Sequence, residues 1–97
     1  MKASLVPINV KPGKMKEVVR LYDESVVPVL KQQKGYKGVL VLTNDSTNRC
    51  YILGLWETDK DAKAFETSGT FQAQVAKFAE LFAERPTREI YELSLQA

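Results

Sequence analysis

Residues 49–57, RCYILGLWE, constrain the fold of this chain more than any other segment. The run is a predicted strand, and its alternate side chains point to opposite faces. One face carries Cys50, Ile52, Gly54 and Trp56, and the other carries Tyr51, Leu53 and Leu55. The preceding predicted strand, 39–43 (VLVLT), is also apolar on both faces. A sheet that contains such strands needs a cover on each side.

Turn signals and hydrophobic spacing place the elements around these strands. Residues 3–10 form a first predicted strand, which Lys11-Pro12-Gly13 ends. A helix follows, and its apolar side is formed by Met15, Val18, Val19, Tyr22, Val26 and Leu30. Gly35 and Gly38 mark the exit from this helix, before the strand at 39–43. The polar tract 44–48 is rich in turn formers and connects the next two strands as a hairpin.

A second helical region is predicted in two parts. The run Thr58–Asp61 matches a capping box, so a short helix starts there. The pair Ser68-Gly69 ends that helix, and Thr70 is the predicted cap of a second segment. Apolar residues of this segment recur at helical spacing as Phe71, Val75, Phe78 and Phe82. Arg85-Pro86 stops the segment, and 87–95 alternates as a last strand with Tyr91, Leu93 and Leu95 on one face.

The order strand, helix, strand, strand, helix, strand predicts an α+β, ferredoxin-like fold with a four-stranded antiparallel sheet and its helices on one face. Because the chain has 97 residues, we expect residues 1–97 to form a single domain. Two helices cover only one face of the sheet, so we expect a second copy of the chain to cover the other in a homodimer. The alternative is a monomer whose third strand is unusually apolar.

Two prolines conflict with a regular first strand and a regular first helix. In the ferredoxin-like order the first strand is central, and Pro7 lacks the N–H that a central strand needs, so we expect a bulge or an early strand end there. Pro28 removes a backbone hydrogen bond inside the first helix and disfavours the helical region at Val27. We therefore expect a kink or a break near Pro28.

Composition narrows the class of protein. The chain is 44% hydrophobic and 27% charged, close to the average of globular proteins. It has no apolar run long enough to span a bilayer and no secretory signal pattern, so we expect a cytoplasmic protein that does not act at a membrane. The net charge of +2 is not gathered into a basic cluster, which argues against binding to nucleic acid. The single Cys50 is interpreted as a buried thiol.

Motifs of several enzyme classes are missing. The sequence contains no Cys/His cluster for a metal, no GxxxxGK[ST] loop for phosphate and no GxSxG nucleophile elbow. The carboxylates Asp59 and Asp61 lie at a predicted helix start, where capping explains them. We therefore expect neither a hydrolase nor a kinase, and neither a metal nor another cofactor.

Four segments, in this order and spacing, resemble the antibiotic biosynthesis monooxygenase superfamily. They are VKPGK at 10–14, VLKQQKGYKGV at 29–39, YILGLWET at 51–58 and FETSGTFQAQVAKF at 65–78. The resemblance implies a ferredoxin-like domain that dimerises sheet to sheet into an α/β barrel, with a pocket between sheet and helices in each subunit. It also implies one of several activities: cofactor-free oxygenation of aromatic polyketides, haem degradation, or conversion of quinols or small carbonyl compounds. Some members have no assigned activity.

The haem-degrading members are a poor match. Val75 stands where they place a ligating histidine, Phe65 where they have a pocket tryptophan, and Val6 near their strand-one asparagine. The chain has no histidine at all, so it also lacks the usual acid or base of neutral pH. The resemblance therefore argues against haem degradation here.

Five residues are candidates for contact with a substrate: Trp56, Tyr22, Asn9, Phe65 and Phe71. Trp56 matches a position that is commonly aromatic in the superfamily and would stack on a flat compound. Its alternative role is to lock the strand end in the core, and Tyr36, Tyr51 and Tyr91 have similar core or interface roles. No catalytic residue is assigned.

Two functions follow from these observations. The first is a cofactor-independent monooxygenase-like enzyme that acts on a small aromatic or quinol-type compound in an apolar pocket. The second is a non-catalytic dimeric module that binds a small apolar ligand or serves as a scaffold. An open pocket lined by Tyr22 or Asn9 beside Trp56 would favour the first, and one filled by Phe65, Phe71 and Phe78 would favour the second.

Overall fold

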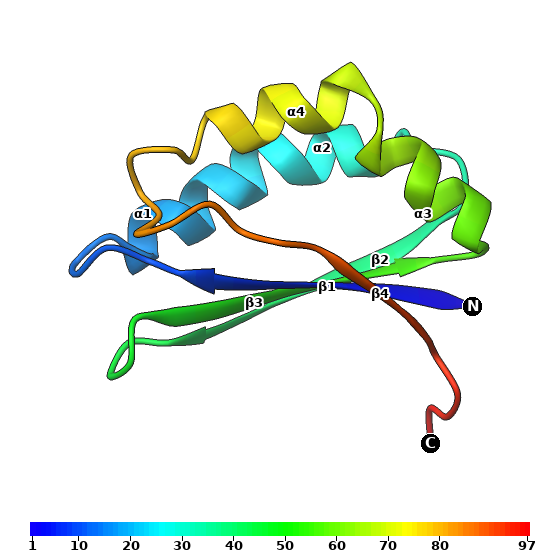
Figure 1. Cartoon of the computed structure of the whole chain (residues 1–97), viewed down its shortest axis with the longest axis horizontal. Coiled ribbons are helices and arrows are strands. Elements are labelled where there is room, and N and C mark those ends of the chain that lie inside the picture. The colour runs from blue at the N-terminus through cyan, green and yellow to red at the C-terminus, as the bar shows by residue number, and fades with distance from the viewer.

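A computed structural model describes residues 1–97, and it has the predicted ferredoxin-like fold (Figure 1). The four strands are β1 (Lys2–Asn9), β2 (Tyr36–Asn44), β3 (Arg49–Trp56) and β4 (Glu89–Glu92). They form one antiparallel sheet in the order β2-β3-β1-β4. All helical segments lie on the same side of this sheet (Figure 1). No helix combines the length and apolar character that crossing a bilayer requires.

The first helical region stays helical across Pro28, so of the predicted kink or break the break does not occur, and the irregularity is a change of winding just before the proline. It consists of α1 (Met15–Leu21), a π-helical turn η1 (Tyr22–Val26) and α2 (Val27–Leu30). The Val27 N–H donates to the carbonyl of Tyr22, five residues earlier, which is the wider π pattern. Pro28 then lies in the first turn of α2, where its missing N–H is tolerated. The chain adapts by changing its winding just before the proline.

The second helical region confirms one predicted cap and corrects the other. Helix α3 (Asp59–Glu66) begins after Thr58, whose hydroxyl oxygen accepts a hydrogen bond from the Asp61 N–H at 3.1 Å. Helix α4 (Gly69–Ala76) is capped by Ser68, which accepts from the Phe71 N–H at 3.2 Å. The prediction that Thr70 caps this helix is therefore wrong. Ser68 both closes α3, through a bond to the Phe65 carbonyl, and opens α4.

The aromatic stripe of the second region extends beyond its helix. Helix α4 ends at Ala76, although Phe78 and Phe82 continue the predicted spacing. Both side chains are buried, and their rings stack with centroids 5.2 Å apart. After the helix the backbone returns to the sheet, where the Ala83 N–H donates to the Asn9 carbonyl at 2.8 Å. The periodicity correctly predicted burial here, but not helical backbone.

Pro7 causes neither a bulge nor an early end of β1, so that prediction is wrong. The strand pairs with β3 in continuous register, with Pro7 opposite Tyr51. The Val10 N–H donates to the Asn48 carbonyl on the β3 side, and ladder bonds alternate, so the nitrogen of Pro7 faces the other edge. The pairing with β4 stops at Leu5, before it reaches Pro7. No ladder bond is therefore lost.

The outer strands differ from their predicted lengths. Strand β2 begins at Tyr36 rather than residue 39, and an irregularity in its pairing with β3 accommodates Gly38 at φ +149°. Strand β4 covers only four residues of the predicted 87–95. It ends where its partner does, because Glu92 is opposite Lys2 at the start of β1. Beyond this point the Leu93 N–H donates to the Met1 carbonyl.

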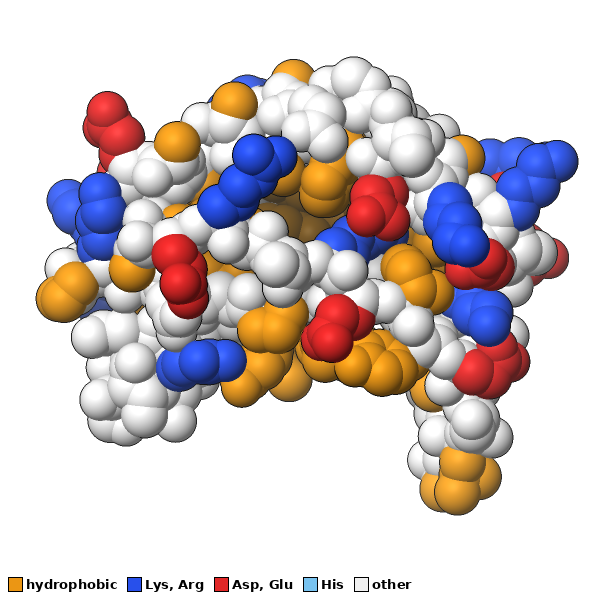
Figure 2. Space-filling model, in the orientation of Figure 1, with side chains coloured by type: hydrophobic (Ala, Val, Ile, Leu, Met, Phe, Trp, Pro, Cys, Tyr) orange, Lys and Arg blue, Asp and Glu red, His pale blue; other side chains and the backbone are white.

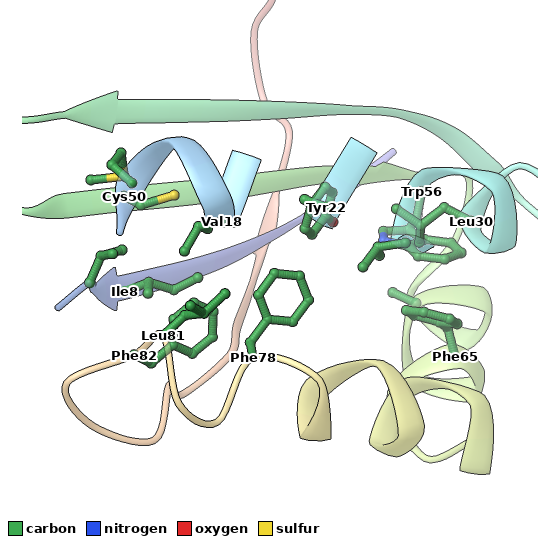
Figure 3. Close-up of a cluster of buried hydrophobic side chains, with 14 residues drawn as sticks. Ile8, Val18, Tyr22, Leu30, Cys50, Trp56, Phe65, Phe78, Leu81 and Phe82 are labelled. Carbon is green, nitrogen blue, oxygen red and sulfur yellow. The ribbon is translucent and has the colours of Figure 1, made fainter. Parts of the chain in front are cut away.

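The core lies between the helices and one face of the sheet (Figure 3). In this core Val18, Tyr22 and Leu30 from the first helical region meet Ile8, Cys50 and Trp56 from the strands. Trp56 and Cys50 are almost fully buried, and burial raises the pKa of the Cys50 thiol. Cys50 therefore has the inert position that was predicted.

The opposite face of the sheet is apolar and open. Leu40 and Leu42 of β2 are 51% and 53% exposed, and Tyr51 and Tyr91 are also exposed. Alternation places these four residues on the side away from the helices, together with Leu53 and Leu55. We call this surface, Leu40, Leu42, Tyr51, Leu53, Leu55 and Tyr91, the open face. In Figure 2 apolar side chains gather on the underside, between two projecting parts of the chain.

Candidate active site

An apolar cavity of about 240 Å³ lies between the sheet and the helices. Its floor is formed by Val6 and Ile8 of β1 and Ile52 of β3, and its roof includes Phe71 and Val75 of α4. The segment 85–88, between α4 and β4, forms one side. Figure 2 shows a hollow below the helical layer, with apolar side chains inside it and charged groups around it.

The π-helical turn holds two residues of the cavity wall in place. Tyr22 and Val26 both line the cavity, and they belong to a row of buried residues at strict four-residue spacing, Val18, Tyr22, Val26 and Leu30. In a uniform α-helix each four-residue step overshoots one turn by about 40°, so three steps would rotate the row by about 120°. A π turn contains more residues and corrects this drift. The wide turn thus keeps Tyr22 and Val26 facing inward.

Tyr22 contributes a hydroxyl to the cavity wall. Its side chain is buried beside Phe78, with ring centroids 6.2 Å apart. Burial raises the pKa of Tyr22 far above its ordinary value, and the nearby Arg88 opposes this shift only weakly. The hydroxyl is therefore protonated at neutral pH, where it can donate a hydrogen bond but cannot act as a base.

The roof is tied to the π turn by a row of polar side chains. The Ser25 hydroxyl donates to Oε1 of Gln74 at 3.0 Å, and Lys77 Nζ donates to the Ser25 oxygen at 2.7 Å. Gln74 is buried and lines the cavity. Because Ser25 accepts from an ammonium group, it has no base to activate it as a nucleophile. The row joins η1 to α4 across the cavity roof.

Arg88 is the charged residue most deeply placed in the cavity wall. Its side chain is only 7% exposed, and Nη1 donates to Glu66 Oε2 at 3.1 Å and to the Ala62 carbonyl at 3.2 Å. The guanidinium carbon lies 5.6 Å from the centroid of the Phe71 ring. Burial lowers the pKa of Arg88, while Glu66 raises it. A cation of this type remains charged at neutral pH.

The predicted aromatic residues form a row that starts at this cavity and leads away from it. Phe71 meets Phe65 edge to face at 5.4 Å, and Phe65 stacks on Trp56 at 5.5 Å. Phe65 and Phe71 line the cavity, but Trp56 does not. Trp56 is 2% exposed, and its Nε1–H has no hydrogen-bond partner. Figure 3 shows Trp56 and Phe65 facing each other at one end of the core.

Asn9 lies apart from the cavity. Its side-chain amide donates to Glu84, and it lines a separate depression with Arg49 and Pro86. Of the remaining tyrosines, Tyr36 packs edge to face on Trp56, whereas Tyr51 and Tyr91 lie on the open face. The structure thus brings together Tyr22, Phe65 and Phe71 around one cavity and leaves Trp56 and Asn9 outside it.

Arg88 and Glu66 were missed from the sequence, although a signal for Arg88 was present. Ile90 is opposite Ser4 on the inner face of the sheet, and Arg88 precedes it by two residues. Alternation therefore directs Arg88 to the same inner side. A charged residue at an inward position of a predicted strand is the signal that would have indicated it.

The family assignment rests on a match over most of the chain. Residues 2–77 match the profile of the antibiotic biosynthesis monooxygenase (ABM) family. The chain belongs to this family. The match includes β1, both cavity-lining residues of η1 and all of α4, but it ends before Arg88. A comparison with curated proteins gives no match.

Solved structures support the same fold. A protein from Bordetella bronchiseptica that is named for the ABM family has a TM-score of 0.84 at 23% identity, over 97% of both chains. One from Nitrosomonas europaea, also named for the family, has a TM-score of 0.79 at 20% identity, over 98% of this chain and 100% of its own. A conserved protein from Methanosarcina mazei has a TM-score of 0.78 at 17% identity, over 94% of this chain and 90% of its own. At these identities the likeness shows the fold alone.

Proposed function

We propose that this ABM-family chain is a cofactor-independent monooxygenase-like enzyme that acts on a small, electron-rich aromatic or quinol-type compound. The observation that carries the proposal is the apolar cavity with Tyr22 in its wall. In such chemistry the deprotonated substrate supplies the electrons, so a dry pocket with one or two hydrogen-bond donors is sufficient. The missing histidine is then no obstacle, provided that the substrate ionises easily.

The size of the cavity limits the substrate. A cavity of about 150 Å³ in another protein holds benzene, and the cavity here measures about 240 Å³. One ring with substituents, or two fused rings, fits this space without movement of the walls. Three-ring compounds would require the segment 85–88 or α4 to shift. Hydroquinones and naphthols are therefore better first substrates than anthrones.

We further propose that the chain acts as a homodimer joined through the open face. This surface has exposed leucines on the edge strand β2 and a half-exposed tyrosine on β4. Monomeric proteins rarely leave a contiguous apolar area of this kind in water. Sheet-to-sheet packing would cover it while leaving the cavity, on the other side of the sheet, in each subunit.

The second candidate is a module that binds a small ligand without transforming it. It is favoured by the position of Trp56, which packs in the core instead of meeting a ligand, and by the absence of a histidine among the cavity residues. The two candidates share the cavity and differ only in whether oxygen is consumed.

Oxygen uptake separates these candidates. We would measure uptake with hydroquinones, naphthols and anthrones, using wild type and Val75→Phe, which places a ring in the cavity. The control is Val19→Phe, because Val19 is an exposed residue of α1 that does not line the cavity. The enzyme proposal expects uptake that Val75→Phe abolishes and Val19→Phe keeps. Binding without uptake for every compound would favour the second candidate, and no binding would refute both.

A further inference from the structure

Arg88 has more hydrogen-bonding capacity than its protein partners use. A guanidinium group has five N–H donors, and both protein hydrogen bonds of Arg88 leave from Nη1. The Nε and Nη2 groups remain for a ligand in the cavity that Arg88 lines. A merely structural link from the segment before β4 to α3 would not need a guanidinium placed in the wall of an apolar cavity.

The charges around the cavity favour an anion. The ionisable lining groups with a charge at neutral pH are Arg85, Arg88 and Glu66, which give two guanidinium groups against one carboxylate. Glu66 is 39% exposed and pairs with Nη1 from the side of α3, so water partly screens its charge. Arg85 is exposed, whereas Arg88 is nearly buried. The positive charge therefore acts inside the cavity through Arg88.

We propose that Arg88 binds the ionised oxygen of a phenol, so that the cavity selects a small aromatic compound with an acidic ring hydroxyl. This inference rests on the proposed function and narrows its substrate class. The Phe71 ring, beneath the guanidinium, provides an apolar contact next to the charge for the ring of such a compound. Tyr22 supplies a neutral hydroxyl elsewhere in the same wall.

Arg88 would also explain how a site without a histidine obtains an ionised substrate. An opposite charge within about 4 to 6 Å lowers the pKa of an acid by about 1 to 3 units. A phenol bound beside Arg88 would therefore lose its proton to water at a lower pH than in solution. The O–H bond breaks heterolytically, the proton leaves to solvent, and the electron pair stays on the oxygen near the guanidinium.

The test uses two probes of similar shape. 4-Nitrophenol absorbs at different wavelengths in its neutral and ionised forms, so the pKa of the bound probe can be read directly, and nitrobenzene lacks the hydroxyl. Wild type is titrated with both probes across a range of pH. Arg88→Gln removes the charge, Arg88→Lys keeps it without the planar group, and Arg85→Gln makes the same charge change at an exposed position. Thermal unfolding checks that each variant is folded.

We expect wild type to bind 4-nitrophenolate about 10- to 100-fold more tightly than nitrobenzene and to lower the pKa of the bound phenol. Arg88→Gln should lose the preference for the phenolate but still bind nitrobenzene. Arg88→Lys should keep part of the preference, and Arg85→Gln should change the preference less than about threefold. Nitrobenzene binding without a preference for the phenolate in wild type would overturn the inference and leave the proposed function standing. Equal loss of both probes in a folded Arg88→Gln would also overturn it, and no binding of either probe to wild type would overturn both proposals.

Discussion

The double substitution Leu40→Gln/Leu42→Gln tests the role of the open face in association. Glutamine keeps the size of each side chain and adds no charge, so the change removes only apolar contact. Full burial of a leucine is worth about 1.5 to 3 kcal/mol, and these side chains are 51% and 53% exposed in the single chain. Burying the exposed half would therefore contribute about 0.8 to 1.5 kcal/mol per side chain.

A symmetric dimer contains four such side chains, which together give about 3 to 6 kcal/mol. Each 1.4 kcal/mol corresponds to a tenfold change, so the dissociation constant should rise by about 10² to 10⁴. Sedimentation equilibrium over a range of concentrations measures this constant. The control is Val19→Gln, because Val19 is 39% exposed on α1, which lies on the helical side of the sheet.

The same experiment can refute the reasoning. If wild type sediments as a monomer at all accessible concentrations, the open face is not a dimer interface of useful strength. If the double variant associates as tightly as wild type while Val19→Gln weakens the dimer, the interface lies on the helical side. The free energy of unfolding of the isolated double variant should change little, since exposed substitutions are usually within about 0.5 kcal/mol.

Three further predictions concern the stability of the fold. Gly35→Ala should destabilise the fold by about 2 kcal/mol or more in urea unfolding, because Gly35 has φ +79° and an added Cβ would clash with the Asp61 side chain; an unchanged midpoint would contradict this. Phe78→Ala should cost about 3 to 5 kcal/mol, since it removes a buried ring stacked on Phe82; a cost below 1 kcal/mol would mean that the neighbouring cavity already loosens this packing. Tyr22 has a raised pKa in the fold, so its contribution to the free energy of unfolding is complete below the unfolded pKa of about 10 and is lost as the pH rises further. Between pH 9 and pH 11 the unfolding free energy of wild type should fall by about 1.4 kcal/mol more than that of Tyr22→Phe. Equal falls in the two proteins would show that Tyr22 ionises freely in the folded chain.

The fold could be predicted because its main signals are local and repeated. The two-sided strand at 49–57, the hairpin at 44–48 and the order of elements indicated the sheet, and the structure has it. The end of α4 could not be predicted from spacing. After the helix has ended, Phe82 is held by its bridge to Val10, just beyond β1, and Phe78 packs on Tyr22 and Phe82. The prediction of a bulge or an early strand end at Pro7 was wrong for a related reason. The length of the neighbouring strand β4 decides whether the missing N–H of Pro7 costs a ladder hydrogen bond.

The candidate site was predicted in part. Tyr22, Phe65 and Phe71 meet at one cavity because helical spacing and aromatic character indicated inward positions on three different segments. Trp56 and Asn9 lie outside it: Phe65 takes the place beside the Trp56 indole, and Asn9 is at the end of β1. For Arg88, alternation with Ile90 was visible in the sequence, but the assembled sheet was needed to show that this strand face meets the helices.

The π turn at Tyr22–Val26 has a consequence for how this helix can change in evolution. Deleting one residue from the turn would restore even winding, but every downstream side chain would then rotate by about 100° around the axis. Val26 and Leu30 would leave the core together, and Pro28 would move to a position that requires an N–H. The extra residue and the proline are therefore expected to be gained or lost as a pair in related sequences.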